Sequence, residues 1–310
     1  MNVIDRAYAR YQASVAWTRR HSAVFDHLWR ARERYNEVLG GRLAAAISYY
    51  GFFAAFSLGL LAYAILGYVL ASDHAFVTQV NGFLSANLPW INSVALSTRR
   101  GALTLIGLVS LVLAGVGWVE SLRSSQRAVW RLEQHPGNYV VRRLLDLVIL
   151  VALGLLLLLS VWLTWAVGRL LAWAVGPDYG RFGGGVLHWS PPVVEFIINI
   201  VLAAALLAGV PRLAMSPRRL LPPAVLLGTG IQILNALVRL VVVRTEHNPA
   251  YALVTGAVGL LVYLYFLNQL IIFASAVAAT GTHGRVVDLA AQASADPPAD
   301  PASIRPPDTP

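Results

Sequence analysis

The sequence has no cysteine in its 310 residues, and this absence excludes disulfides, thiolate metal sites, iron–sulfur clusters and cysteine nucleophiles. Charge is also scarce, because Asp, Glu and Arg together make up 13% of the chain, whereas a soluble domain carries about 25% charged residues. Hydrophobic residues reach 57%. The chain therefore has too little polar surface for an ordinary soluble enzyme and too much apolar surface for a disordered protein. The composition predicts an integral membrane protein.

Lysine is absent as well, so all 24 basic residues are arginine, and against 15 acidic residues they give a net charge of +9. A basic excess can indicate a nucleic-acid partner. In a membrane protein, however, it more often reflects cytoplasmic loops that are rich in basic residues. The position of each arginine decides between these two interpretations.

Six apolar runs are each long enough, at about 20 residues, to cross a bilayer as a helix. We expect spans at residues 43–71, 102–120, 144–174, 191–210, 220–243 and 251–279. These runs predict an all-α integral membrane protein with six transmembrane helices, over residues 43–280.

The two ends of the chain differ from this domain. Residues 1–42 contain eight arginines and apolar residues at helical spacing, which is typical of amphipathic helices in the membrane interface with arginine reaching anionic headgroups. A solvated cytoplasmic helix is the alternative. The first long apolar run starts at Leu43, too far along the chain for a cleaved signal peptide. Residues 281–310 include a proline-rich stretch, and we expect a disordered tail there.

Arginine positions predict the orientation. With the N-terminus inside, eighteen of the 24 arginines fall on cytoplasmic segments, which places both termini in the cytoplasm. Two outer segments look distinctive: residues 74–97 read as an amphipathic helix on the outer leaflet, and the glycine-rich residues 176–190 read as a loop.

Ionisable residues inside a span are costly and usually face a partner or a wet cavity. Arg169, Glu195 and Arg239 each lie near the outer end of a predicted span, so Glu195 can pair with either arginine and leave the other for an anion. Asn199, Asn235 and Gln232 continue the same helix faces and predict a polar seam between the fourth and fifth spans. Two interpretations stay open: a structural fastening of the bundle, or a site for a phosphate or lipid headgroup.

A second polar group lies toward the cytoplasm. Ser48, Tyr49 and Tyr50 fall near the inner end of the first span, and Asn268 lies somewhat deeper in the sixth. Interfacial anchoring or a route for a headgroup or ion are the alternatives.

Arginines also recur every four residues beyond the second span. Arg123, Arg127 and Arg131 predict contacts with anionic lipid headgroups. Asp146, beside Arg142 and Arg143, predicts a local salt bridge.

Several short motifs follow one another in a recognisable order. They are Arg42 with Ala44-Ala45-Ala46-Ile47-Ser48-Tyr49-Tyr50, Phe56-Ser57-Leu58, Arg142-Arg143-Leu144-Leu145-Asp146, Pro217-Arg218-Arg219 with Leu221-Pro222, Asn248-Pro249-Ala250-Tyr251, and Tyr263-Leu264-Tyr265. Over about residues 35–280 the chain resembles the YihY/BrkB (virulence factor BrkB) family of bacterial inner-membrane proteins, once described as ribonuclease BN. The resemblance implies a six-helix protein of the cytoplasmic (inner) membrane linked to envelope integrity, with lipid transport proposed for some members.

The chain departs from the family pattern at two places in the last span. It reads Tyr251-Ala252 where relatives commonly have Tyr-Gly, and Ala274-Ser275-Ala276 where they commonly have Gly-Ala-Glu. A role carried by that glutamate therefore does not transfer to this chain.

Enzyme chemistry finds no support in the sequence. The seven histidines lie in loops or terminal segments without metal-ligand spacing, and neither a phosphate-binding glycine loop nor a GxSxG elbow is present. We therefore expect no catalytic residue, no cofactor, no metal and no nucleic-acid partner.

We expect a protein that binds and moves an anionic amphipathic molecule, namely a lipid or a lipid-linked envelope precursor. The alternative is a non-transporting membrane scaffold or regulator that recruits lipids or partners through its basic cytoplasmic surface. A homo-oligomer is left open, because small residues on the last two predicted spans permit close helix contact: Gly228, Gly230, Ala252, Gly256 and Gly259.

Overall fold

Long apolar helices make up nearly all of the fold. The computed structural model describes residues 3–69, 100–175, 181–245, 249–282 and 284–294. The helices are α1 (Val3–His21), α2 (Ala23–Glu37), α3 (Gly40–Val69), α6 (Arg100–Val129), α7 (Tyr139–Val175), α8 (Arg181–Ala204), α9 (Pro217–Thr245), α10 (Pro249–Thr280) and α11 (Leu289–Ser294). A π-helical turn, η2 (Ala205–Gly209), continues α8, and two short strands, β1 (Leu213–Met215) and β2 (Val286–Asp288), complete the described elements.

The predicted all-α architecture is confirmed, and over the described residues each predicted span coincides with a long helix, the fourth continuing from α8 into η2. By length and apolar composition, four stretches of the described residues could cross a membrane: Leu105–Val129, Tyr139–Ser160, Pro217–Leu240 and Gly256–Thr280. A fifth results if Ala23–Glu37 and Gly40–Gly59, bent by 67° at their junction, count as one span. Val193–Gly209 is apolar but shorter. The structure thus gives four or five candidate spans, and the count of six stays a prediction.

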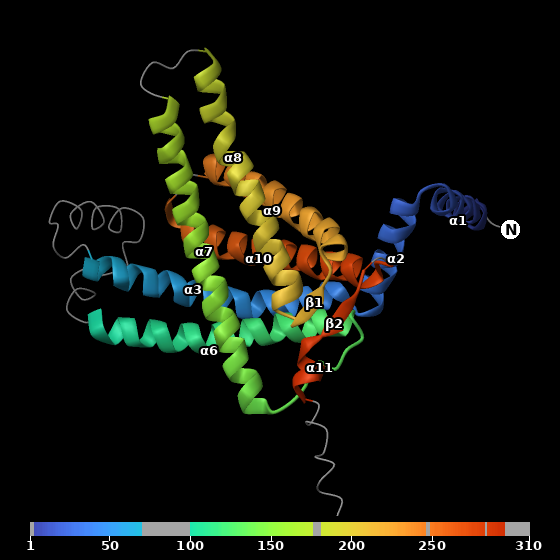
Figure 1. Ribbon diagram of the computed structural model, residues 1–310, viewed down its shortest axis with the longest axis horizontal. Coiled ribbons are helices and arrows are strands. Elements are labelled where there is room, and N and C mark those ends of the chain that lie inside the picture. The colour runs from blue at the N-terminus through green and yellow to red at the C-terminus, as the bar shows by residue number, and fades with distance from the viewer. Residues whose placement is uncertain (1–2, 70–99, 176–180, 246–248, 283, 295–310) are drawn as a thin grey trace, which may run out of the picture.

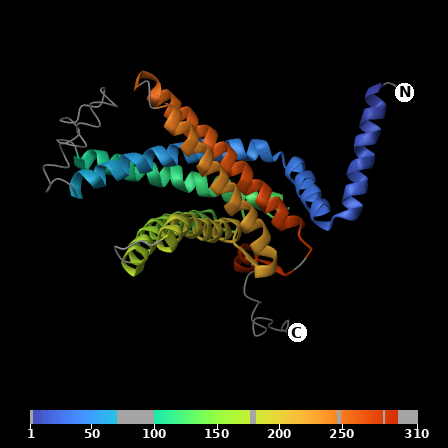
Figure 2. The ribbon, with the colours of Figure 1, turned by 90° about the horizontal axis from the view of Figure 1, so that it is seen from above.

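The helices pack as two pairs joined by α9 and α10. In Figure 1, α3 and α6 run side by side in opposite directions, and α7 and α8 form a second antiparallel pair that crosses them steeply. Figure 2 shows α7 and α8 on one side of the α3/α6 pair. Helix α10 packs on α3 and on α9, and α9 packs on α8. The most deeply buried apolar side chains lie where these helices meet: Ile47, Leu122, Leu207, Leu227 and Ile271.

Only some of the glycines that were predicted to permit close helix contact lie against a neighbouring helix. A Cβ on Gly228 would lie 3.2 and 3.3 Å from backbone atoms of Ile200, so α8 and α9 approach closely there. A Cβ on Gly230 would meet the Leu270 side chain of α10 at 3.0 Å. Gly256 and Gly259 have nothing within 4 Å among the described residues, so they make no such contact in this chain.

The N-terminal helices attach to the bundle through α2. Ser22 caps α2 by accepting a hydrogen bond from the Phe25 amide at 3.2 Å. His27 contacts the Val277 carbonyl of α10 through its Nε2 at 2.9 Å, whereas α1 extends away from the other helices (Figures 1 and 2). The bend into α3 uses Leu39 at φ 54° and Gly40, where a Cβ would collide with the Tyr35 ring.

Part of the predicted disordered tail is folded. Strand β2 pairs antiparallel with β1, with Leu213 opposite Asp288 and Met215 opposite Val286. The Ser216 amide donates to the Arg285 carbonyl at 3.2 Å, and the Leu289 amide donates to the Arg212 carbonyl at 3.1 Å. The disordered tail predicted from residue 281 therefore does not extend over residues 284–294, which contain β2 and α11. Residues 295–310 lie outside the described part of the chain.

The two segments predicted to lie on the outer side have different outcomes. The predicted glycine-rich loop at 176–190 is helical from Arg181 onward, since α8 starts there, ten residues before the predicted span. The predicted amphipathic helix at 74–97 lies outside the described residues.

Candidate functional site

The predicted polar seam between α8 and α9 forms in the structure. Arg239 donates through Nη2 to both carboxylate oxygens of Glu195, at 2.9 and 3.2 Å. One helical turn away, Asn199 donates from Nδ2 to Oε1 of Gln232 at 2.9 Å. The contacts follow from spacing, because residues four apart share one helix face. We call these four residues, with Asn235 and Tyr263, the polar seam.

Tyr263 extends the polar seam to α10, and sequence reasoning did not assign it to the site. Its hydroxyl donates to Oδ1 of Asn235 at 3.0 Å. One feature of the sequence could have indicated Tyr263: a tyrosine hydroxyl inside an apolar helix needs a hydrogen-bond partner. The polar seam thus links three helices.

The end of the polar seam that holds Arg239 and Glu195 is exposed. The Arg239 side chain is 68% exposed and that of Glu195 is 28% exposed, and neighbouring apolar side chains such as Leu240 and Ile197 are exposed as well. Among the described residues, Nε and Nη1 of Arg239 have no hydrogen-bond acceptor. Arg169, the alternative partner, lies on α7 with an exposed side chain and an interaction of its own.

The second predicted group divides into two parts. Asn268 is buried and donates from Nδ2 to Oγ of Ser48 at 3.0 Å. Tyr49 and Tyr50, in contrast, are 59% and 43% exposed and stack edge to face, with ring centroids 5.6 Å apart. The structure therefore joins Asn268 to Ser48 but not to the exposed tyrosine rings.

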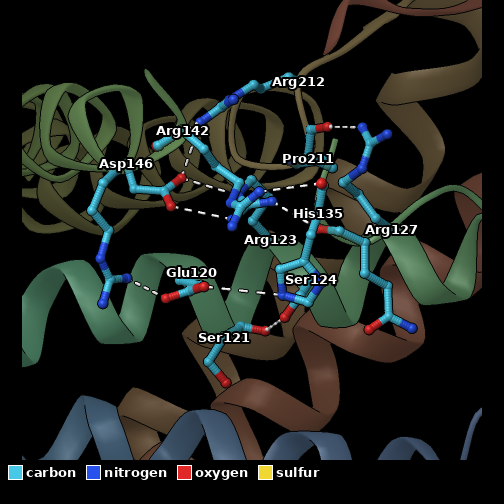
Figure 3. Close-up of polar contacts among 12 residues, drawn as sticks. Glu120, Ser121, Arg123, Ser124, Arg127, His135, Arg142, Asp146, Pro211 and Arg212 are labelled. Atoms are coloured by element: carbon cyan, nitrogen blue, oxygen red, sulfur yellow. Dashed lines mark hydrogen bonds and ion pairs between the residues drawn. The ribbon is translucent and has the colours of Figure 1, made fainter. Parts of the chain in front are cut away.

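A third cluster lies where the C-terminal end of α6 meets the start of α7 and the η2–β1 connection. Arg123 donates from Nε and Nη2 to the two oxygens of Asp146, at 2.9 and 3.2 Å, and both side chains have no exposed surface. Arg212 donates to the same carboxylate at 3.0 Å, and the Arg123 guanidinium also donates to the Gln134 carbonyl. Figure 3 shows the dashed contacts of Asp146 with both arginines.

Arg127 extends this cluster to the C-terminal segment. Its Nη1 and Nη2 donate to the two oxygens of Asp288 at 2.9 and 2.7 Å, and Nη1 also donates to the Pro211 carbonyl at 3.1 Å. Arg127 is 1% exposed. We call Arg123, Arg127, Asp146, Arg212 and Asp288 the inner network, since they lie at the ends of helices that the arginine distribution predicts to be cytoplasmic.

The electrostatics of the inner network follow from this geometry. The hydrogen bonds from Arg127 hold the pKa of Asp288 below its ordinary value, although burial opposes this shift. Burial lowers the pKa of the Arg212 guanidinium, and the positive charges of Arg123 and Arg127 lower this pKa as well. The carboxylate of Asp146 opposes this shift, because it raises the pKa of Arg212. Three guanidinium groups thus share two carboxylates.

These contacts correct two predictions. Arg123 and Arg127 cannot contact lipid headgroups as they lie here, because α6 continues to Val129 and turns both side chains into the protein. Arg131 has a 67% exposed side chain and pairs with Glu37 at 3.1 Å. Asp146 is also not a surface partner of its sequence neighbours.

Arg142 and Arg143, the sequence neighbours of Asp146, have other partners. Arg142 donates to the His135 carbonyl at 3.1 Å, and Arg143 pairs with Glu120. Over the described residues, no group of three or more His, Asp or Glu side chains comes together in a way that could hold a metal ion.

Comparisons with known proteins place the chain among inner-membrane proteins. The family model of virulence factor BrkB matches residues 31–299, from α2 past α11. An uncharacterised protein of Dickeya dadantii (strain 3937) is 27% identical over 295 residues, covering 87% of this chain and 88% of the relative. Inner membrane protein YhjD of Escherichia coli (strain K12) is 24% identical over 280 residues, covering 84% of this chain and 82% of the relative. No solved structure matches the chain.

Proposed function

This chain belongs to the virulence factor BrkB family and is a multi-pass inner-membrane protein, and we propose that it binds and moves an anionic amphipathic molecule. The molecule is a lipid or a lipid-linked envelope precursor. The proposal includes six spans with both termini in the cytoplasm, as the arginine distribution favours. It assigns no catalytic step to the chain.

The exposed guanidinium of Arg239 carries this proposal. An arginine stays charged in a protein, and a charge on the apolar surface of a membrane helix is costly unless it has partners. Glu195 engages only Nη2 of Arg239. A phosphate group can accept hydrogen bonds from the remaining nitrogens in the forked geometry that arginine prefers.

The surroundings of Arg239 fit the rest of an amphipathic ligand. Exposed apolar side chains stand on either side of Arg239 in α9, namely Val238 and Leu240. Acyl chains can lie along these side chains while the headgroup meets Arg239. Asn199, Gln232, Asn235 and Tyr263 then supply a polar track between the helices, and we assign the route's inner half to Tyr49, Tyr50 and Asn268.

Native mass spectrometry of gently purified protein tests the proposal by identifying retained lipids. We expect a defined anionic lipid on the wild type, and its loss from Arg239→Gln. Arg218→Gln is the matched control, because Arg218 is an exposed arginine near the other end of α9. A lipid mixture that is the same in all three folded proteins contradicts the proposal and leaves Arg239 as a structural partner of Glu195.

A scaffold or regulator is the second candidate, and the position of α1 favours it. This helix extends from the bundle (Figure 1) with Tyr11 52% and Trp17 63% exposed, beside exposed Arg10 and Arg20. Such a surface fits an anionic membrane or a partner protein. Removing residues 1–21 deletes α1 together with Arg19, which pairs with Asp26 and Glu33, but keeps the Ser22 cap of α2 and the contact of His27 with α10. Loss of function in this variant, together with normal function of Arg239→Gln, would favour the scaffold.

A further inference from the structure

The carboxylate of Asp288 occupies a binding geometry that also suits a phosphate group. Both terminal nitrogens of Arg127 donate to it, one to each oxygen, at 2.9 and 2.7 Å. This parallel fork is the arrangement in which arginine binds carboxylates and phosphates alike. Asp288 comes from β2, whereas Arg127 belongs to the helical bundle, so one partner of the pair is on a peripheral segment.

Removing Asp288 would leave a strongly cationic site. Arg127 would then have no carboxylate partner, while Arg123 and Arg212 share the single carboxylate of Asp146. Nε of Arg212 is already buried without an acceptor among the described residues. Buried guanidinium groups without a counter-charge are costly, so the vacated site would take up an anion.

The segment that carries Asp288 is held by the β1–β2 pairing and by the backbone hydrogen bonds at Arg285 and Leu289, and Asp288 itself also accepts from the amides of Ala290 and Ala291. The two-stranded sheet has three residues in each strand, and such a sheet is marginal without further packing. Arg219 adds a hydrogen bond of 3.3 Å from Nη1 to the Gly284 carbonyl. The Asp288 side chain is 16% exposed and Arg127 only 1%, so the carboxylate lies between solvent and the guanidinium.

We propose that residues 284–294 form a displaceable cover over an anion site made by Arg127 and Arg212, where a phosphate group competes with the carboxylate of Asp288. This site is distinct from the polar seam, because Arg212 precedes the first residue of α9 and Arg239 lies near the last turns of that helix. The phosphate group is either free or the headgroup of an anionic lipid, and the experiment distinguishes these sources.

A reversible disulfide can lock the cover. Ala214 and Val287 lie opposite each other in the β1–β2 pair, and cross-strand Cα atoms in such pairs are about 4.5–5.5 Å apart, within the range of a disulfide. Because the chain has no cysteine, an Ala214→Cys/Val287→Cys protein contains only this bridge. The same sample can therefore be measured oxidised and reduced, with the single Ala214→Cys variant as a control for the oxidant.

Binding is measured with two probes on the full chain in neutral detergent. Inorganic phosphate is titrated by calorimetry, and retention of added phosphatidic acid is read by native mass spectrometry. We expect the reduced double variant to bind one of the probes and the oxidised form to bind it at least tenfold more weakly. Asp288→Asn should bind at least tenfold more tightly than the wild type, since the competing carboxylate is neutral, and Arg127→Gln/Asp288→Asn should lose this gain.

The outcomes show whether the phosphate group is free or belongs to a lipid, and whether Asp288 is displaced at all. A gain with phosphate supports a site for the free ion, and a gain with phosphatidic acid alone supports a lipid headgroup. Equal binding by the oxidised and reduced forms overturns the proposal and makes Asp288 a permanent clamp, as does an Asp288→Asn protein that binds no better than the wild type. Because Arg239 is intact in all these variants, failure here is independent of failure at the polar seam.

Discussion

Arg123 and Asp146 form an ion pair with two hydrogen bonds, 2.9 and 3.2 Å long, and neither side chain has exposed surface. A buried ion pair is tolerated only where further hydrogen bonds satisfy the remaining donors and acceptors. The Gln134 carbonyl does this for Arg123, and Arg212 does so for Asp146. The pair joins α6 to α7, and Arg212 adds the η2–β1 connection.

Asp146→Asn should strongly destabilise the protein, because it leaves two buried guanidinium groups without their shared carboxylate. We expect a loss of about 3–5 kcal/mol in the free energy of unfolding, measured by denaturant titration in mixed micelles. Glu120→Gln is the control. It removes a partly exposed pair with Arg143 and should cost no more than about 1 kcal/mol. Equal losses in both variants would contradict this account.

The inner network shows where sequence reasoning failed. Asp146 lies three and four residues from Arg143 and Arg142, and this spacing normally favours a local pair on a helix surface. Burial decides the outcome instead, because α7 presents Asp146 to an arginine 23 residues earlier in the chain. A surface assignment of Arg123 and Arg127 failed for the same reason: a four-residue repeat indicates one face of a helix but not what covers it.

The polar seam shows where sequence reasoning succeeded. The lengths of the apolar runs located the helices. Because polar residues inside such runs are few, each of them has few possible hydrogen-bond or ion-pair partners. Spacing of four residues then placed Glu195 with Asn199, and Arg239 with Asn235. The partner on α10, Tyr263, was missed because contacts between helices depend on their packing, which one sequence does not specify. Strand β2 was missed because its three residues are too few to show a period.

Gly228→Ala should weaken the contact between α8 and α9. The new Cβ would lie 3.2 and 3.3 Å from backbone atoms of Ile200, which cannot move without separating the helices, and overpacking of this kind costs about 1–3 kcal/mol. Gly259→Ala is the matched control, since nothing lies within 4 Å of that Cβ among the described residues. It should be neutral or stabilise α10 by up to about 1 kcal/mol. Gly228→Ala should therefore lower the free energy of unfolding, whereas Gly259→Ala should leave it unchanged or raise it. A Gly228→Ala protein as stable as the wild type would refute the close contact.

Arg219→Ala should loosen the C-terminal end of α10. The guanidinium donates to the Ala278 and Ala279 carbonyls at 3.0 and 3.1 Å, which are among the helix-end acceptors without a partner inside the helix, and it lies 5.2 Å from the centroid of the Trp130 ring. We expect a loss of about 1–3 kcal/mol and faster amide exchange in the last turn of α10. Arg218→Ala, one residue away and exposed, should change neither quantity. Unchanged exchange in Arg219→Ala would show that water replaces these bonds at no cost.

Acid should release the pair between Arg127 and Asp288. Because hydrogen bonds from Arg127 hold the pKa of Asp288 below its ordinary value, which is about 3.9 in the unfolded chain, the pair stabilises the fold at neutral pH. This stabilisation is lost only as the pH falls below about 4 and through the lowered pKa. Arg127 stays charged throughout. Other carboxylates titrate in the same range, so the informative quantity is the difference in free energy of unfolding between the wild type and Asp288→Asn. That difference should be constant from pH 7 to about pH 5 and shrink below about pH 4. A difference that persists unchanged at pH 3 would show that the carboxylate of Asp288 contributes nothing through its charge.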